Sequence, residues 1–177
     1  QPLFTESGEY NHFLKAAKDV SRLADVAVLA YVLMPNHVHF LLEGDLSAVA
    51  AFFHRLNTRY VVWFNRRHGR VGHLFQGRFK SKPVEDDAYM ITVVVYVALN
   101  PVKAGLSRTA VGYPWGSASP QAAWLGLVNR ERLAELVNLD AVADRLQQAE
   151  LGLPDLPDPF APEGSAFPDA ARSGQGG

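Results

Sequence analysis

Apolar side chains recur at helical spacing near the start of the chain. Within residues 6–23 they share one helical face, which is formed by Tyr10, Phe13, Leu14, Ala17, Val20 and Leu23. This spacing predicts an amphipathic helix, with Ser7 as its N-cap and Asp25 as the residue that ends it.

A β-hairpin is predicted directly after this helix. Residues 26–33 are rich in Val, Leu and Tyr, which favour a strand. Residues 34–36 (Met-Pro-Asn) predict a turn, because proline presets φ and asparagine tolerates tight geometry. Residues 37–43 would form the returning strand.

A long helix is predicted for residues 46–68. Four large apolar residues lie at intervals of four along one face, namely Phe52, Leu56, Tyr60 and Phe64. Glycines interrupt the sequence that follows, and residues 74–84 are predicted to form a further strand.

The segment 86–99 has features of a strand and of a helix. Its β-branched residues favour a strand, whereas Asp86 and Asp87 suit a helix N-terminus. A helix here would place on one face Tyr89, Val93, Tyr96 and Asn100. Pro101 would end or kink that helix.

Composition limits the class of protein. The chain has 177 residues, 48% of them hydrophobic and 20% charged, as in ordinary globular domains. The absence of cysteine excludes a disulfide scaffold, a thiolate metal site and a cysteine nucleophile. The longest apolar run, residues 26–34, is about half as long as a membrane span, so no membrane partner is expected.

Charge is distributed unevenly although the net charge is only −1. Residues 46–84 contain no Asp or Glu, but they contain eight of the 17 basic residues, with aromatic residues between them. Basic side chains neutralise phosphates and aromatic rings stack on unpaired bases, so the stretch favours nucleic-acid binding. A solvated helix face with core aromatics is the alternative interpretation.

The C-terminal part reverses this pattern. Helices are predicted over residues 120–127 and 130–148. Residues 140–177 contain seven acidic residues and two arginines, and five of the 11 prolines lie between positions 154 and 168. Residues 151–177 are therefore predicted to be a disordered, acidic tail.

Two histidines flank one valine in the predicted returning strand. His37 and His39 would point to the same face of that strand, where two imidazoles can bind one divalent cation. An isolated pair of this kind is more often structural. The neighbouring basic segment supports a metal site, because it would bring a polyanion to the open coordination positions.

Three ordered blocks resemble a known family. Residues 31–42 (YVLMPNHVHFLL) resemble the histidine–hydrophobe–histidine block of the HUH single-tyrosine transposases. Residues 72–80 (GHLFQGRFK) and 96–106 (YVALNPVKAGL) resemble two further blocks. The last block is similar to the REP-associated tyrosine transposase branch, and the resemblance extends over about residues 3–115.

The resemblance implies a fold and a set of site residues. The fold would be α+β, with a ferredoxin-like antiparallel sheet and helices on one face. His37 and His39 would bind Mg²⁺ or Mn²⁺, Asn100 would be the third ligand, and Tyr96 would be the nucleophile. Tyr96 could instead be a core aromatic, and Asn100 could cap a short helix that starts at Pro101.

The resemblance also implies a division of the chain. Residues 1–115 would form the catalytic domain, residues 116–150 a helical extension and residues 151–177 the tail. Members of the family have a first strand beside the histidine strand, and this strand is expected to be missing from the chain as given. The protein would act as a monomer or homodimer in the bacterial cytoplasm, on the nucleoid.

The implied reaction is metal-dependent cutting and rejoining of single-stranded DNA at REP-type hairpins through a 5′-phosphotyrosine. Expected DNA contacts are Arg55, Arg59, Arg66, Arg67, Arg70, Arg78 and Lys80. His73 is a weak candidate for the general base. A non-catalytic protein that binds DNA or RNA hairpins is the main alternative. A hydrolase of small phosphorylated substrates is a minor one, for which Glu43 is the nearest acid in sequence.

Overall fold

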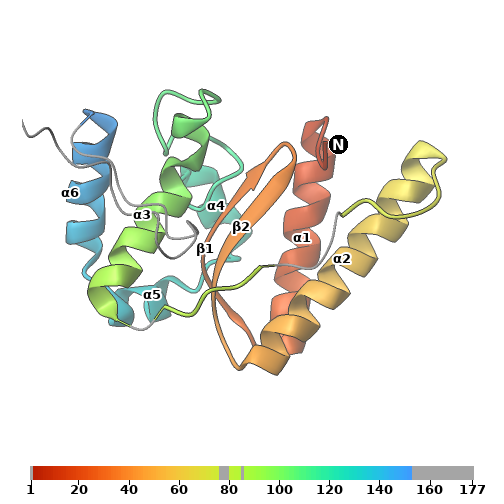
Figure 1. Ribbon diagram of the computed structural model, residues 1–177, viewed down its shortest axis with the longest axis horizontal. Coiled ribbons are helices and arrows are strands. Elements are labelled where there is room, and N and C mark those ends of the chain that lie inside the picture. Colours follow the sequence, from red (N-terminus) through yellow and green to blue (C-terminus); the bar gives the residue numbers. More distant parts are fainter. Residues whose placement is uncertain (1, 76–79, 85, 153–177) are drawn as a thin grey trace, which may run out of the picture.

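The computed structural model describes residues 2–75, 80–84 and 86–152 (Figure 1). Within these residues the expected α+β class with an antiparallel sheet is confirmed. The elements are α1 (Ser7–Ala24), β1 (Ala27–Met34), β2 (His37–Glu43), α2 (Leu46–His68), α3 (Asp87–Lys103), α4 (Pro120–Leu125), α5 (Arg130–Leu136) and α6 (Leu139–Glu150). None of the described helices is long and apolar enough to cross a membrane. Nearly all of the predicted tail lies outside the described residues.

The hairpin of β1 and β2 is the centre of the fold. The two strands pair antiparallel from Ala27 opposite Glu43 to Met34 opposite His37. A bulge between Val28 and Ala30 interrupts the register. Because the extra residue shifts the alternation of side chains, Leu29 and Ala30 pack in the same hydrophobic cluster.

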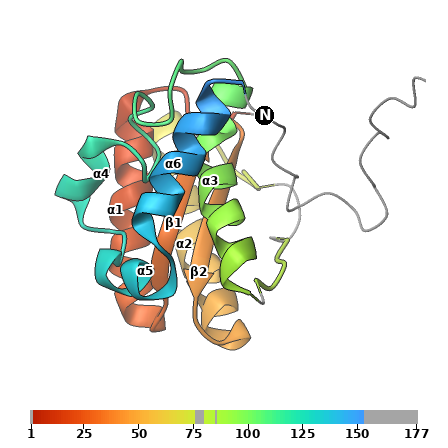
Figure 2. The ribbon, with the colours of Figure 1, turned by 90° about the vertical axis from the view of Figure 1, so that its left-hand side faces the viewer.

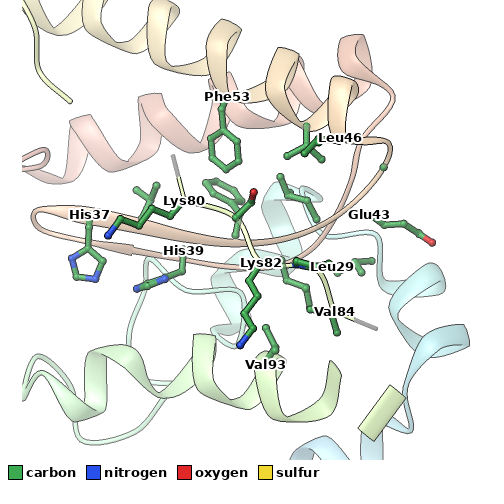
Figure 3. A pocket seen from close by; sticks show the side chains of 18 of the residues that line it. Leu29, His37, His39, Glu43, Leu46, Phe53, Lys80, Lys82, Val84 and Val93 are labelled. Carbon is green, nitrogen blue, oxygen red and sulfur yellow. The ribbon is translucent and has the colours of Figure 1, made fainter. Parts of the chain in front are cut away.

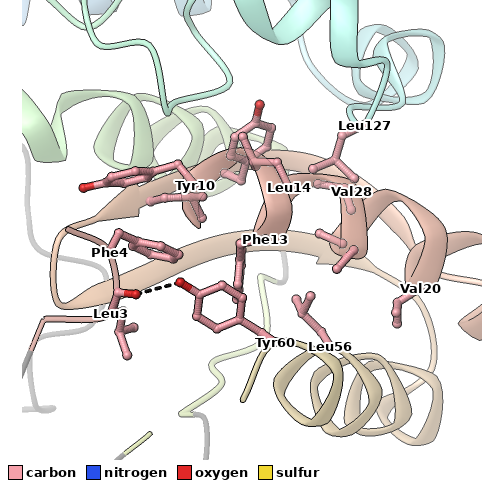
Figure 4. Close-up of a cluster of buried hydrophobic side chains, with 14 of the residues drawn as sticks. Leu3, Phe4, Tyr10, Phe13, Leu14, Val20, Val28, Leu56, Tyr60 and Leu127 are labelled. Atoms are coloured by element: carbon pink, nitrogen blue, oxygen red, sulfur yellow. Dashed lines mark hydrogen bonds between the residues drawn. The ribbon is translucent and has the colours of Figure 1, made fainter. Parts of the chain in front are cut away.

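Helices cover both faces of the hairpin, whereas the resemblance implied helices on one face (Figure 1). On one face, α1 and α2 pack against side chains such as Val28, Tyr31 and Phe40. This cluster contains a fully buried Tyr60, whose hydroxyl donates a 2.7 Å hydrogen bond to the carbonyl of Leu3 (Figure 4). On the other face, α3 packs against a cluster of side chains from both strands.

The two edges of the hairpin differ. The outer edge of β1 is bridged by backbone of the C-terminal part, where the amide of Ser117 donates to Tyr31 and the amide of Asn129 donates to Val28. The outer edge of β2 pairs with no strand among the described residues. It borders a cavity of about 1070 Å³ instead.

The predicted strand over residues 74–84 is wrong for the part that the structure describes. Leu74 is buried with α2, whereas residues 80–83 are all exposed and have no regular secondary structure. A strand needs one face that packs on the core, and these four residues offer none. Residues 76–79 lie outside the described residues.

Two of the predicted helices differ from the observed ones, one in its N-cap and one in its continuity. Glu6 rather than Ser7 is the N-cap of α1, and its backbone amide donates to the Glu9 carboxylate. The single helix predicted for residues 130–148 is split into α5 and α6, because Asn138 caps a new helix by accepting from the amides of Asp140 and Ala141.

The ambiguous segment before Pro101 is a helix, as one of the two interpretations proposed. Pro101 does not end this helix at Asn100, because α3 continues through it to Lys103. Proline disrupts a helix interior chiefly through its missing amide donor and its clash with the preceding turn. Pro101 lies in the last turn of α3, so the one backbone hydrogen bond that its ring removes is close to the helix end rather than in the helix middle.

Candidate functional site

The two histidines lie on the face of β2 that α3 covers. Side chains alternate along the strand, so Val38 and Phe40 pack with α1 and α2 while His37 and His39 point toward α3 (Figure 3). The two imidazole rings are neighbours, with centroids 4.9 Å apart and planes at 90°. The sequence prediction that both rings share one face is thus met.

The turn before β2 orients the His37 ring. Nδ1 of His37 lies 2.7 Å from Oδ1 of Asn36. An amide oxygen only accepts, so Nδ1 donates, and Nε2 presents its lone pair. His37 is exposed at the start of β2, and the partial desolvation that it does undergo lowers its pKa, which favours the neutral imidazole that a metal ion requires.

Tyr96 meets these histidines from the opposite element. Its ring packs against the cluster under α3, and its centroid lies 5.9 Å from that of His39 at an interplanar angle of 88°. Residues 57 positions apart in sequence are thereby brought together. Nζ of Lys103 lies 5.3 Å from the Tyr96 ring centroid. Lys103 was not among the residues expected at the site, although it lies two helical turns after Tyr96 on the same face.

Asn100 lies one turn after Tyr96 within α3. Its side-chain nitrogen donates a 2.9 Å hydrogen bond to the carbonyl of Tyr96. Asn100 therefore does not cap a separate helix, and that alternative is wrong. Asn100 and Lys103 both lie in the last turn of α3, so this helix carries an amide and an ammonium group just after the phenol of Tyr96.

The cavity beside β2 continues from the histidines (Figure 3). His37 and His39 line it together with Lys80 and Lys82, and the rest of its wall is largely apolar. Lys80 was among the expected DNA contacts. Lys82 was not, although it belongs to the same acid-free segment, and its Nζ lies 5.8 Å from the Tyr89 ring centroid.

Most of the expected arginines of α2 lie away from this cavity. Arg55 donates to the carbonyl of Leu23, Arg59 lies 3.9 Å from Asp19, and Arg67 pairs with Glu6, so these three contact α1. The guanidinium of Arg70 lies over Phe64, and Arg66 is exposed. Arg78 lies outside the described residues.

Acidic metal ligands are not gathered at this site. Among the described residues no group of three His, Cys, Asp or Glu side chains is placed to hold a metal ion. Glu43 ends β2 roughly 13 Å beyond His39 at the usual strand rise, and it is bonded to Arg132. His73 is exposed after α2 and lies among no such group.

Comparison with known proteins gives two matches. The model of a family described as IS200-like transposases matches residues 1–100. A solved structure of a REP-associated tyrosine transposase bound to a REP hairpin has a TM-score of 0.54 at 21% identity. The alignment covers 63% of this chain and 66% of that one, and the likeness shows the fold. No curated protein matches the sequence.

Proposed function

This chain belongs to the family of IS200-like transposases, and on that basis we propose that it cuts and rejoins single-stranded DNA at hairpins through a tyrosine nucleophile. The observation that carries the proposal is the meeting of three rings. His37, His39 and Tyr96 come from a strand and a helix that are distant in sequence, and they form one row of neighbouring side chains. If Tyr96 were only a core aromatic residue, its packing would not require two histidines beside it.

The proposed metal ligands are His37, His39 and Asn100, with Mg²⁺ or Mn²⁺ as the ion. Neutral imidazole nitrogens are common ligands of divalent metals, and an amide oxygen is the kind of ligand that Mg²⁺ and Mn²⁺ prefer. Three protein ligands leave coordination positions for phosphate oxygens. The hydrogen bond from Nδ1 of His37 to Asn36 supports this role, because it leaves the lone pair of Nε2 available to bind a metal ion. When bound, the ion would polarise the phosphate and stabilise its developing charge.

Tyr96 would attack the phosphorus of the scissile phosphate. A bond forms between the phenol oxygen and phosphorus, and the bond from phosphorus to the 3′ oxygen breaks. The phenol loses its proton and the leaving oxygen gains one, which gives a 5′-phosphotyrosine and a 3′-hydroxyl. A phenol, with a pKa of about 10, leaves more readily than a sugar hydroxyl, so a later 3′-hydroxyl can reseal the strand.

The acid-free segment would supply the DNA contacts. Lys80 and Lys82 line the cavity beside the histidines, where phosphates next to the scissile bond would lie. The arginines of α2 and those that follow it would bind more distant phosphates of the hairpin. These are Arg55, Arg59, Arg66 and Arg67 on the helix, with Arg70 and Arg78 after it. Such contacts position DNA without reading its sequence.

A covalent-adduct assay tests the proposal. The full chain is incubated with Mn²⁺ and a DNA hairpin carrying a single-stranded flank, and adducts that survive denaturing gel electrophoresis are counted. We expect an adduct from the wild type, none from Tyr96→Phe, and none when a chelator is added. Tyr31→Phe is the matched control, because the Tyr31 ring is buried against α1 and α2, away from the histidines. An equal adduct yield from Tyr96→Phe would refute the assignment.

A second candidate function is hairpin binding without catalysis. It is favoured by the lack of a three-residue His, Cys, Asp or Glu metal cluster among the described residues. The same assay, together with a measurement of hairpin affinity, separates the two candidate functions. A protein that only binds hairpins would form no adduct with any divalent metal, and its affinity would be unchanged by a chelator.

A further inference from the structure

The C-terminal helices contact both elements that carry the candidate site. α5 packs against β1 and is bonded to Glu43 at the end of β2, and α6 lies along the outer face of α3 (Figure 2). Both helices follow residue 100, where the family match ends. The site residues of β2 and α3 are therefore held from outside by a part of the chain that contributes no side chain to the chemistry.

α5 is fixed to the histidine strand through Arg132. The guanidinium Nη2 lies 2.6 Å from Oε1 of Glu43, and Nε lies 2.8 Å from Oε2 of the same carboxylate. Nη1 donates to Glu135 of the same helix at 2.8 Å. Two parallel bonds to one carboxylate fix an orientation as well as a distance. The end of β2 thus has a defined place relative to α5.

α6 is fixed to the tyrosine helix through apolar contacts. Val95 and Leu99 of α3 are 0% and 3% exposed, and the side chains packed against them include Val142 and Leu146 of α6. At the far end of α6, the Glu150 carboxylate accepts a 2.6 Å hydrogen bond from the amide of Ala110, in the loop after α3. The face of α3 that carries Val95 and Leu99 is therefore covered by α6.

The junction between α5 and α6 is short and internally bonded. Val137 is 6% exposed, and its amide donates to the carbonyl of Leu133. The next residue, Asn138, caps α6 with two backbone hydrogen bonds. Only Val137 and Asn138 separate the two helices, and both are hydrogen-bonded, so few torsions are free at the junction.

We propose that α5 and α6 form a bracket that sets the spacing between the histidine strand and the tyrosine helix, with Arg132 as a positioning residue. The catalytic meaning of this spacing rests on the proposed function. An in-line attack needs the phenol within bonding reach of a phosphate held at the histidines, and a misplacement of about 1 Å can cost about 100-fold in rate. Loss of the bracket would loosen the site while α2 and its arginines remain in place.

A distance measurement tests the bracket without any need for catalysis. The chain has no cysteine, so spin labels can be placed at two sites alone. Asp45→Cys and Ala104→Cys put labels on exposed positions after β2 and after α3. The distance distribution is recorded by pulsed electron resonance in the full chain, alone and combined with Arg132→Gln, Leu146→Asp or Gln147→Asp.

We expect the first two changes to shift or broaden the distribution. Gln147→Asp is the matched control, because it puts the same charge on an exposed position next to Leu146. Far-UV circular dichroism verifies folding, and Leu146→Ala replaces Leu146→Asp if the latter unfolds. Distributions equal to the wild type in both folded bracket variants would overturn the proposal.

An activity measurement then connects the bracket to the chemistry. At saturating hairpin DNA, adduct formation in Arg132→Gln is expected to slow by about 10-fold or more, while hairpin affinity stays within about twofold because no phosphate contact is lost. Equal losses of rate and affinity would contradict a positioning role. If the wild type forms no adduct, the proposed function fails, but the distance distributions still decide whether the bracket exists.

Discussion

The two faces of the hairpin are built from different kinds of side chain. Toward α1 and α2 the strand β2 presents Val38, Phe40 and Leu42, and these join a cluster dense in aromatic rings. Toward α3 the same strand presents His37, His39 and Leu41. Strand alternation alone separates the two sets. One short strand thus serves as core on one face and as candidate site on the other.

The difference concerns what each face can tolerate. On the aromatic face Phe13 is fully buried, with its ring centroid 5.3 Å from that of Phe4 and 5.0 Å from that of Tyr60. The polar groups here are bonded within the protein, such as the Tyr60 hydroxyl to Leu3. On the α3 face the imidazoles border a cavity. We infer that stability depends mainly on the first face and chemistry on the second.

The largest expected effect is on the aromatic face. Phe13→Ala should lower the free energy of unfolding by about 3–5 kcal/mol, because it leaves a cavity among rigid rings. Phe53→Ala is the matched control, since Phe53 is half-buried and lines the existing cavity. Urea unfolding followed by circular dichroism measures both. If both changes lowered the free energy of unfolding equally, the aromatic cluster would contribute no more to stability than the wall of the cavity does.

The second prediction compares two neighbouring residues of β2, one of which should affect activity and the other stability. His39→Ala should leave the free energy of unfolding within about 0.5 kcal/mol but lower the metal-dependent adduct yield by about 100-fold. Val38→Ala should do the opposite, with a loss of about 1 kcal/mol in stability and little change in yield. The two variants are compared by urea unfolding and by the adduct assay. An unaffected yield in His39→Ala would identify the histidines as structural.

Local patterns predicted the elements that position the site. The residues of α2 and β2 were predicted with the observed bounds, because both have a clear period and are bounded by turn residues. The shared face of His37 and His39 follows from strand geometry alone. The resemblance to a transposase family supplied Tyr96, whose contact with His39 no local pattern could give.

Other features depend on contacts that are distant in sequence. Residues 74–84 have strand-like composition, but residues 80–83 are exposed and have no partner strand among the described residues. The bond between Glu43 and Arg132 joins positions 89 apart. Asn138 divides α5 from α6 by capping the second helix. This effect is local, but the apolar residues of 130–148 continue at helical spacing across it, so the pattern predicted one helix.

The third prediction concerns a buried carboxylate at the α1–α2 contact. Burial by itself raises the pKa of Glu9, but hydrogen bonds from Thr5, His68 and Glu6 outweigh it and hold the pKa below its usual value. The ionised form is thus favoured in the folded state. Its contribution to stability is present above the unfolded pKa and is lost as pH falls through the folded pKa.

Glu9→Gln should remove this contribution. We expect a loss of about 1–3 kcal/mol at neutral pH, since a buried hydrogen-bond network is broken, and a weaker fall in stability on acidification. Asp144→Asn, on the exposed face of α6, is the control and should leave the pH profile unchanged. Unfolding free energies measured from neutral to acidic pH decide the matter. A Glu9→Gln profile parallel to that of the wild type would contradict the assignment.

The smallest expected effect distinguishes the surfaces of the two regions. Arg59 on α2 is half-exposed and lies 3.9 Å from Asp19, too far for a strong ion pair, so its charge is available to a phosphate. Arg59→Gln should reduce the slope of log affinity against log salt by about 0.7–0.9, the value for one lost phosphate contact, without changing sequence preference. Arg145→Gln removes the same charge from α6, outside the acid-free segment, and should leave the slope unchanged. Hairpin titrations at several salt concentrations give both slopes. If Arg145→Gln reduced the slope as much as Arg59→Gln, the affinity for DNA would depend only on the net charge of the protein. The surface of α2 would then bind DNA no more directly than the surface of α6.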